Sequence, residues 1–133
     1  MIVDASLVVR TFFPDEAQEG AQAVIREHVA GRVPLKAPDL LAYELTNAVW
    51  QAERRGRIDS EMAKGILAAM SGLQIELLKV GWEEMLAMAR RFQLSAYDAA
   101  YLALAERLGE TLMTGDERLF RAVDEKLEWV KLI

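Results

Sequence analysis

The chain has 133 residues, of which 53% are hydrophobic and 28% are charged, and its formal net charge is −5. These values predict one soluble globular domain rather than a disordered protein, and they argue against a protein that coats nucleic acid by charge alone. The absence of cysteine excludes disulfides and thiolate metal sites. The first residues lack the basic region of a signal peptide, and the longest segment without charge, Gly65 to Ile75, is too short to span a membrane.

Short apolar runs alternate with longer segments whose apolar residues recur at helical spacing. In chain order, the first half predicts a strand at Ile2–Val3, a helix over Ser6–Phe13 that stops before Pro14, a helix from a cap at Asp15 to about Ala30, a strand at Leu35–Ala37, a helix from a cap at Asp39 to about Arg55, and a helix from Asp59 to about Ser71. A glycine directly follows each of the last three helices, as is typical of helix ends.

The second half continues the alternation. It predicts a strand at Ile75–Val80, a helix over Trp82–Phe92, a helix over Tyr97–Leu108, a strand at Thr111–Thr114, a helix over Glu117–Val123 and a strand at Trp129–Leu132. This order predicts a single α/β domain over residues 1–133, with about five parallel strands and helices on both faces of the sheet. Ligands of such sheets bind beyond the carboxyl ends of the strands.

Two acidic residues follow predicted strands directly and are therefore expected at that edge of the sheet. Asp4 follows the first strand, and Asp116 follows the strand that ends at Thr114. Each also fits a structural role, because side-chain oxygens at such positions accept hydrogen bonds from free backbone N–H groups of a helix. Asp4 would share that role with Ser6, whereas Thr114 would cap the later helix with Glu117 as its partner, which leaves Asp116 free.

Two further acidic residues lie in the first turns of predicted helices. Glu44 is at the border of the apolar face of its helix, where Asn47 is close enough to hydrogen-bond it; the alternative is a solvated glutamate. Asp98 fits a capping box with Ser95, but the helix that it opens is rich in alanine and nearly uncharged, which predicts that the helix is deeply packed.

The four acids, taken together, predict a shared site. Carboxylates that lie close together repel one another, and this cost falls when Mg²⁺ or Mn²⁺ binds between them, since hard cations prefer oxygen ligands. We expect Asp4, Asp98 and Asp116 to be metal ligands, directly or through water, and Glu44 to be a ligand or a base. The only histidine, His28, is expected to be solvated near a helix end, so a zinc site of histidine and cysteine is excluded.

Two other features bear on partners. Arg54 and Arg55 belong to a basic cluster that is either a solvated helix end or an RNA contact. The helix from Asp59 to Ser71 carries a stripe of apolar residues at helical spacing, which predicts a homodimer through the helices between Asp39 and Ser71.

At these residues the chain resembles the PIN-domain family, and specifically the toxin ribonucleases of the VapBC type. The matching pieces are Ile-Val-Asp4-Ala-Ser6, Tyr43-Glu44-Leu-Thr-Asn47, Tyr97-Asp98-Ala-Ala-Tyr101-Leu-Ala-Leu-Ala105 and Leu112-Met-Thr114-Gly-Asp116-Glu-Arg-Leu119. A single motif such as Asp-Ala-Ser is weak, but the ordered set of four, which spans the chain from end to end, is specific.

The resemblance implies a five-stranded parallel sheet and a pocket that binds Mg²⁺ or Mn²⁺ through Asp4, Glu44, Asp98 and Asp116. Ser6, Asn47 and Thr114 match positions that support this pocket in the family. The resemblance further implies a metal-dependent ribonuclease that acts on RNA as a toxin, and a cytoplasmic homodimer that a VapB-type antitoxin neutralises.

Other functions remain as alternatives. A catalytically silent PIN-fold binding module would keep the same fold. A receiver-like phosphoryl-signalling domain needs an acceptor aspartate after the third strand, where this chain has Gly81-Trp82. A phosphatase of the haloacid-dehalogenase type needs Asp-x-Asp after the first strand, where this chain has Asp4-Ala-Ser6.

Overall fold

The computed structural model describes residues 1–16 and 18–133 and contains a five-stranded parallel sheet with the strand order β3-β2-β1-β4-β5. The strands are β1 (Ile2–Val3), β2 (Lys36–Pro38), β3 (Glu76–Leu78), β4 (Leu112–Thr114) and β5 (Val130–Leu132). All four strand pairings are parallel, which confirms the predicted sheet.

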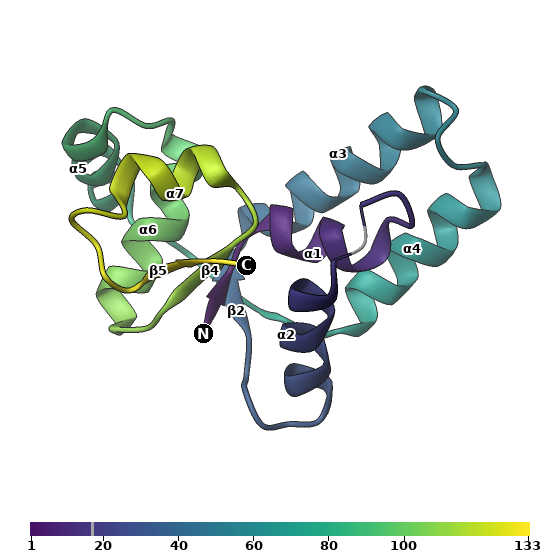
Figure 1. Ribbon diagram of the computed structural model, residues 1–133. Helices are drawn as coiled ribbons and strands as arrows, with labels where there is room; N and C mark the ends of the chain where they lie inside the picture. The colour runs from purple at the N-terminus through teal and green to yellow at the C-terminus, as the bar shows by residue number, and fades with distance from the viewer. Residues whose placement is uncertain (17) are drawn as a thin grey trace.

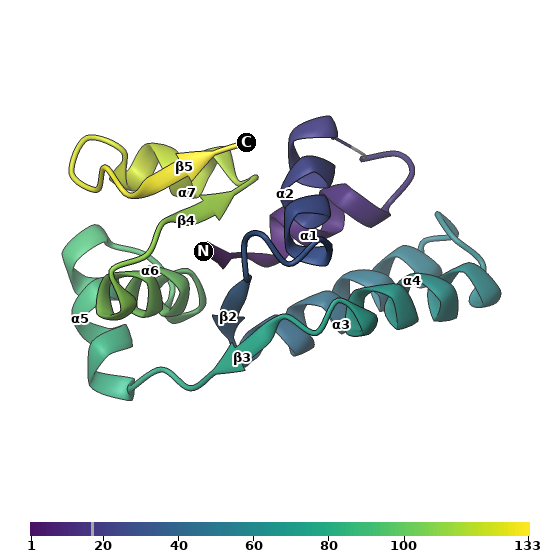
Figure 2. The ribbon, with the colours of Figure 1, turned by 90° about the horizontal axis from the view of Figure 1, so that it is seen from below.

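Helices cover both faces of the sheet, as predicted. They are α1 (Ala5–Phe12), α2 (Glu19–Val29), α3 (Leu40–Arg54), α4 (Ser60–Gly72), α5 (Trp82–Phe92), α6 (Ala96–Leu108) and α7 (Glu117–Val123). Figures 1 and 2 show α5 and α6 on one side of the sheet and α1 to α4 on the other. None of the helices in the described part of the chain is both long enough and apolar enough to cross a membrane.

The central strand β1 is short but completely buried. Ile2 is opposite Lys36 of β2 on one side and Leu112 of β4 on the other, and neither Ile2 nor Val3 is exposed to solvent. The chain proceeds from β1 outward to β2 and β3, and then crosses back to place β4 on the other side of β1. The carboxyl ends of β1 and β4 therefore form the point where the strand order reverses, which is where sheets of this type bind ligands.

Alanines allow α6 to lie close to the sheet. Seven consecutive residues of this helix, Ala99 to Ala105, are buried, and the helix contacts β1, β2 and β4. The deep packing predicted from the composition of this segment is confirmed. Because Ser95 caps the helix by accepting a hydrogen bond from the backbone N–H of Asp98, the first turn of α6 begins at a fixed place.

The prediction that Asp15 caps the second helix is wrong. Helix α2 begins at Glu19, and its N-cap residue is Gln18, which makes no capping hydrogen bond with its side chain. The carboxylate of Asp15 instead forms an ion pair with Arg57, at 2.8 Å. The carboxylate that the local spacing predicted to cap the helix therefore pairs with an arginine from a loop that is distant in sequence.

Helices α3 and α4 form an antiparallel hairpin that extends away from the sheet (Figure 1). Their contact buries Leu45, Val49, Ile66 and Met70. Glu44 lies at the end of the hairpin near the sheet, and Arg54 lies ten residues further along α3, which corresponds to about 15 Å along a helix axis.

Candidate functional site

Asp4 is the buried centre of a hydrogen-bond network at the ends of β1 and β4. Its side chain caps α1 by accepting a hydrogen bond from the backbone N–H of Leu7. The hydroxyl of Ser6 donates to Oδ1 of Asp4 at 2.5 Å, and the hydroxyl of Thr114 donates to Oδ2. The same two hydroxyls accept hydrogen bonds from the backbone N–H groups of Gly115 and Asp116. The turn after β4 is thereby connected to the carboxylate after β1.

Burial makes the charge of Asp4 costly. The residue is only 5% exposed, and this desolvation raises the pKa of its carboxyl above the ordinary value of 3.8. The hydrogen bonds from Ser6, Thr114 and Leu7 oppose the shift, and the negative charge of Asp116 adds to it. Burial and the charge of Asp116 both disfavour the ionised form of Asp4, so a cation that approaches its carboxylate stabilises that form.

Replacing Asp4 by Asn is therefore expected to change how stability depends on pH. Because the pKa of Asp4 is higher in the folded protein than in the unfolded chain, ionisation destabilises the folded state as pH rises above about 4. The melting temperature of Asp4→Asn relative to wild type should rise as the pH increases above about 4, with about 1 kcal/mol corresponding to roughly 4 °C.

Thermal melts of both proteins in EDTA across this pH range measure that difference. A constant offset between the two proteins reflects only the changed hydrogen bonds of the amide. A relative melting temperature of the variant that falls as pH rises would show that the folded protein favours the charged carboxylate.

Glu44 is held from the opposite side by Tyr101. The phenolic hydroxyl of Tyr101 donates to Oε1 of Glu44 at 2.6 Å and joins α6 to α3. Partial burial raises the pKa of Glu44, and the charges of Asp4 and Asp98 raise it further, while the hydrogen bond from Tyr101 opposes the shift. Burial also raises the pKa of Tyr101, so its hydroxyl remains protonated and available as a donor.

Asp98 and Asp116 share one cation, the guanidinium of Arg118. Nη2 of Arg118 lies 2.8 Å from Oδ2 of Asp98 and 3.2 Å from Oδ2 of Asp116. The other oxygen of Asp116 accepts hydrogen bonds from the backbone N–H groups of Arg118 and Leu119, so Asp116 itself caps α7. The prediction that Thr114 caps this helix and leaves Asp116 free is wrong, since the hydroxyl of Thr114 is bonded to Asp4.

The structure therefore brings the four predicted acids together at the edge of the sheet where β1 and β4 end. Asp4 and Asp116 influence each other electrostatically, as do Glu44 and both Asp4 and Asp98, and Arg118 bridges Asp98 and Asp116. All four of these side chains carry carboxylate oxygens, the donor type that a hard divalent cation prefers. In residues 1–16 and 18–133, however, no three side chains of acid or histidine are arranged to hold a common metal ion.

The other predicted site residues divide into two groups. Ser6 and Thr114 belong to the network around Asp4. Asn47 is exposed on α3, and Arg54 and Arg55 are exposed at the far end of the same helix. His28 is not solvated as predicted: one ring nitrogen is 2.7 Å from the carbonyl oxygen of Leu73, and the other accepts the backbone N–H of Leu35. It therefore fixes two loops.

Two residues of the site had no assigned role in the sequence prediction. Tyr101 is three positions after Asp98, and this spacing places the two side chains on the same face of a helix, which is a usable signal. Arg118 is two positions after Asp116, but its partner Asp98 is 20 positions away, and no periodicity indicates that pairing.

The chain is similar to known proteins over most of its length. The family model for the PIN domain matches residues 1–126. Ribonuclease VapC3 of Pyrobaculum aerophilum is 31% identical over 123 residues, which cover 90% of this chain and 91% of that protein. Ribonuclease VapC1 of Mycobacterium tuberculosis is 31% identical over 128 residues, with 91% and 89% coverage. The crystal structure of PAE2754 from Pyrobaculum aerophilum superposes with a TM-score of 0.72 at 29% identity and covers 91% of this chain and 77% of that one.

Proposed function

Because the chain belongs to the PIN-domain family, we propose that residues 1–133 form a metal-dependent ribonuclease, the toxin of a type II toxin–antitoxin pair. The observation that carries this proposal is the meeting of Asp4, Glu44, Asp98 and Asp116 at the point where the strand order reverses between β1 and β4. Two relatives that cover about nine-tenths of the chain are named ribonucleases, which supports RNA as the substrate.

We assign the metal, Mg²⁺ or Mn²⁺, to Asp4, Asp98 and Asp116. When bound, such an ion orients a water molecule, lowers its pKa and stabilises the charge that develops on the phosphate during hydrolysis. Asp4 has a free lone pair on Oδ2, since that oxygen accepts only the Thr114 hydroxyl, and the Ser6 and Leu7 donors hold Oδ1 in place. These three donors keep the carboxylate in one orientation without occupying all of its acceptor capacity.

Glu44 is assigned the role of the group that takes up the proton of the attacking water. Its raised pKa brings the carboxylate closer to the neutral range in which a general base works best. Tyr101 fixes one of its oxygens through the hydrogen bond between α6 and α3, so the other oxygen points to a constant position. Tyr101 is thus a positioning residue for Glu44.

The proposed contacts with RNA extend from the acidic site along the α3–α4 hairpin. Arg54 and Arg55 are exposed at the far end of α3, about 15 Å from Glu44, which suits binding of the RNA backbone beyond the scissile bond. Their contribution is expected to be electrostatic and therefore dependent on salt.

A VapB-type antitoxin is the partner that we propose from the names of the relatives. A cytoplasmic location, where the RNA substrate and this antitoxin would be met, belongs to the same proposal. Such a partner must cover the acidic site or the path to it if it is to prevent cleavage. The catalytically silent module remains the competing function, and the absence of three converging ligands within the described residues is the observation that favours it.

The chain is expected to form a homodimer through α3, α4 and the neighbouring sheet edge. Trp50 and Met62 on these helices and Leu77 on β3 are 51%, 44% and 44% exposed, and β3 is an edge strand with a free side. A second copy would cover both the apolar side chains and the free edge of β3. Light scattering at micromolar concentration should give about twice the mass of one chain, and a monomer at that concentration would refute this assignment.

Cleavage of a labelled single-stranded RNA panel tests the proposed function. Activity should require Mg²⁺ or Mn²⁺ and should stop when EDTA is added. Ca²⁺ should bind but support little turnover, because its looser coordination holds water and phosphate less well. Cleavage that continues undiminished in EDTA, or no cleavage of any RNA with either metal after the antitoxin has been removed, would favour the silent module.

A further inference from the structure

The guanidinium of Arg118 lies where two of the proposed metal ligands converge. One nitrogen atom, Nη2, bonds both Oδ2 of Asp98 and Oδ2 of Asp116, so these two oxygens are no more than about 6 Å apart. We propose that Arg118 and the metal ion are alternative occupants of this place, and that the ion binds only after the guanidinium has left. The inference rests on the proposed function, because it takes Asp98 and Asp116 to be metal ligands.

The hydrogen bonds of Asp116 prevent Arg118 and the metal ion from binding its carboxylate at the same time. Oδ1 accepts two backbone N–H groups, those of Arg118 and Leu119, and so its lone pairs are used in capping α7. Oδ2 is the oxygen that remains for an ion, and Arg118 is bonded to it. A divalent cation at that oxygen would also lie beside a guanidinium of the same charge sign, which the short distance makes unfavourable.

Arg118 is held weakly enough to leave. Its side chain is 65% exposed, whereas the side chains of Asp98 and Asp116 are 22% and 32% exposed. Ion pairs with a partner this exposed contribute little net stability, because water solvates the free guanidinium almost as well. The carboxylates stay at the site through the helices that carry them, while the long arginine side chain is free to rotate into solvent.

Arg118 and Asp116 themselves line an open hollow of about 360 Å³, so the guanidinium has open space beside it into which to rotate. The hollow is also lined by Arg10, Gly115 and Glu16. Glu16 already pairs with Arg57, at 3.0 Å, and this pairing weakens its attraction for a second arginine. In the proposed exchange the guanidinium moves from Asp98 and Asp116 into water, and Oδ2 of each carboxylate becomes available to the ion.

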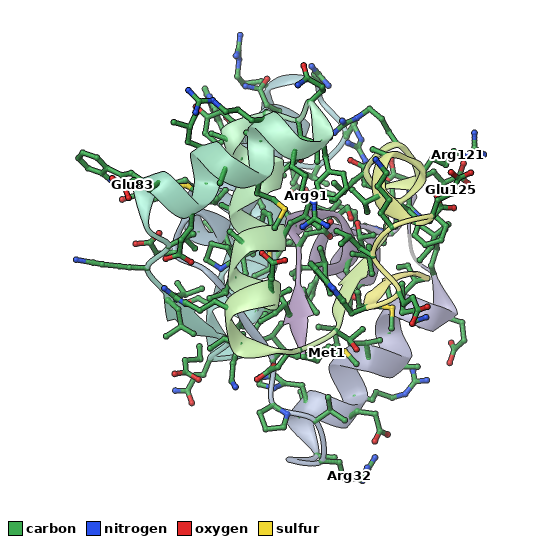
Figure 3. All side chains as sticks on the ribbon, turned by 90° about the vertical axis from the view of Figure 1, so that its left-hand side faces the viewer. Met1, Arg32, Glu83, Arg91, Arg121 and Glu125 are labelled. Atoms are coloured by element: carbon green, nitrogen blue, oxygen red, sulfur yellow. The ribbon has the colours of Figure 1, made fainter. Side chains whose placement is uncertain are left out.

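The test compares Mn²⁺ affinity among variants of the full chain by isothermal titration calorimetry. Arg118→Gln should bind Mn²⁺ about fivefold more tightly than wild type, as expected when a competing ion pair of this exposure is removed. Arg121→Gln is the matched control, because Arg121 lies one turn further along α7, pairs with Glu117 at 3.0 Å and points to the outer surface (Figure 3). Its affinity for Mn²⁺ should equal that of wild type.

The outcomes separate the inference from the proposed function. An equal or weaker affinity of Arg118→Gln, with Mn²⁺ bound normally by wild type, overturns the exchange and leaves the metal site intact. An absence of Mn²⁺ binding by wild type, Arg118→Gln and Arg121→Gln overturns the proposed function, and the exchange with it. A fivefold gain that also appears in Arg121→Gln assigns the effect to net charge and overturns the exchange.

A second variant at Arg118 separates the loss of the ion pair from a change of fold. Arg118→Lys keeps the positive charge but cannot bond two carboxylates through one fixed planar group, so its affinity for Mn²⁺ should fall between those of wild type and Arg118→Gln. In EDTA, Arg118→Gln should melt no higher than Arg121→Gln, because Asp98 and Asp116 lose their shared counter-ion. A melting temperature in EDTA above that of Arg121→Gln would show that Arg118 does not relieve their repulsion and would overturn the proposal.

Discussion

Replacing Asp98 by Asn is expected to lower the rate of RNA cleavage by at least two orders of magnitude. The amide keeps the size of the side chain but removes the charge that the metal ion and Arg118 compete for. Asp4→Asn and Asp116→Asn should each cause a loss of similar size, because a missing ligand displaces or empties the same metal site. The three losses should be far from additive, since residues that act as one unit fail together.

Single-turnover cleavage by wild type and Asp98→Asn, purified in parallel from the same host, measures this effect. Equal cleavage by both preparations would assign the activity to a contaminant or to another site. Arg54→Ala with Arg55→Ala is the contrasting variant, because these side chains lie about 15 Å from Glu44 along α3. It should weaken RNA binding and its salt dependence while the rate at saturating RNA is largely kept.

Millimolar Mg²⁺ or Mn²⁺ is expected to raise the melting temperature of the wild-type protein by roughly 10 °C. A ligand that binds only the folded state stabilises it by about 2.7 kcal/mol when its concentration is a hundred times its Kd, and a chain of this length gains several degrees per kcal/mol. Asp98→Asn should lose most of this gain. In EDTA the same variant should melt close to wild type or above it, because one negative charge has been removed from the acidic site.

Differential scanning fluorimetry with EDTA, Mg²⁺ and Mn²⁺ gives these values. Asp124→Asn is a suitable control, since Asp124 is an exposed acid at the end of α7. Wild-type melting curves that coincide with and without metal would count against a shared carboxylate site, and a gain that Asp98→Asn retains in full would place the metal elsewhere.

The sequence was sufficient for the order and type of all the elements, because apolar periodicity reports which faces are buried and burial decides the fold. Helix beginnings were predicted less well, since several polar residues compete for the same backbone groups. Asp15 fits a helix cap by spacing but pairs with Arg57, whereas Asp116 caps α7 because Thr114 is occupied by Asp4. In each case a distant partner decides between two locally equivalent arrangements.

The placement of Asp4, Asp116 and Asp98 followed from two strand ends and one helix first turn, which are fixed by the backbone, whereas Glu44 lies beyond the first turn of α3. The contacts that tune them were not predictable in the same way. Tyr101 and Glu44 are 57 positions apart, and their hydrogen bond depends on how α6 crosses α3. The position of Arg118 depends on the rotamers of a long, exposed side chain, for which the sequence pattern carries no information.

The position of β1 at the centre of the sheet also determines when the site is assembled during synthesis. Thr114, which donates a hydrogen bond to Asp4, lies 110 positions after it in the chain. Chains are made from the N-terminus at a limited rate, so the whole segment between the two strands must leave the ribosome before β4 can pair with β1. Asp4 therefore lacks this donor, and the acidic site is incomplete, until the residues up to β4 have been made.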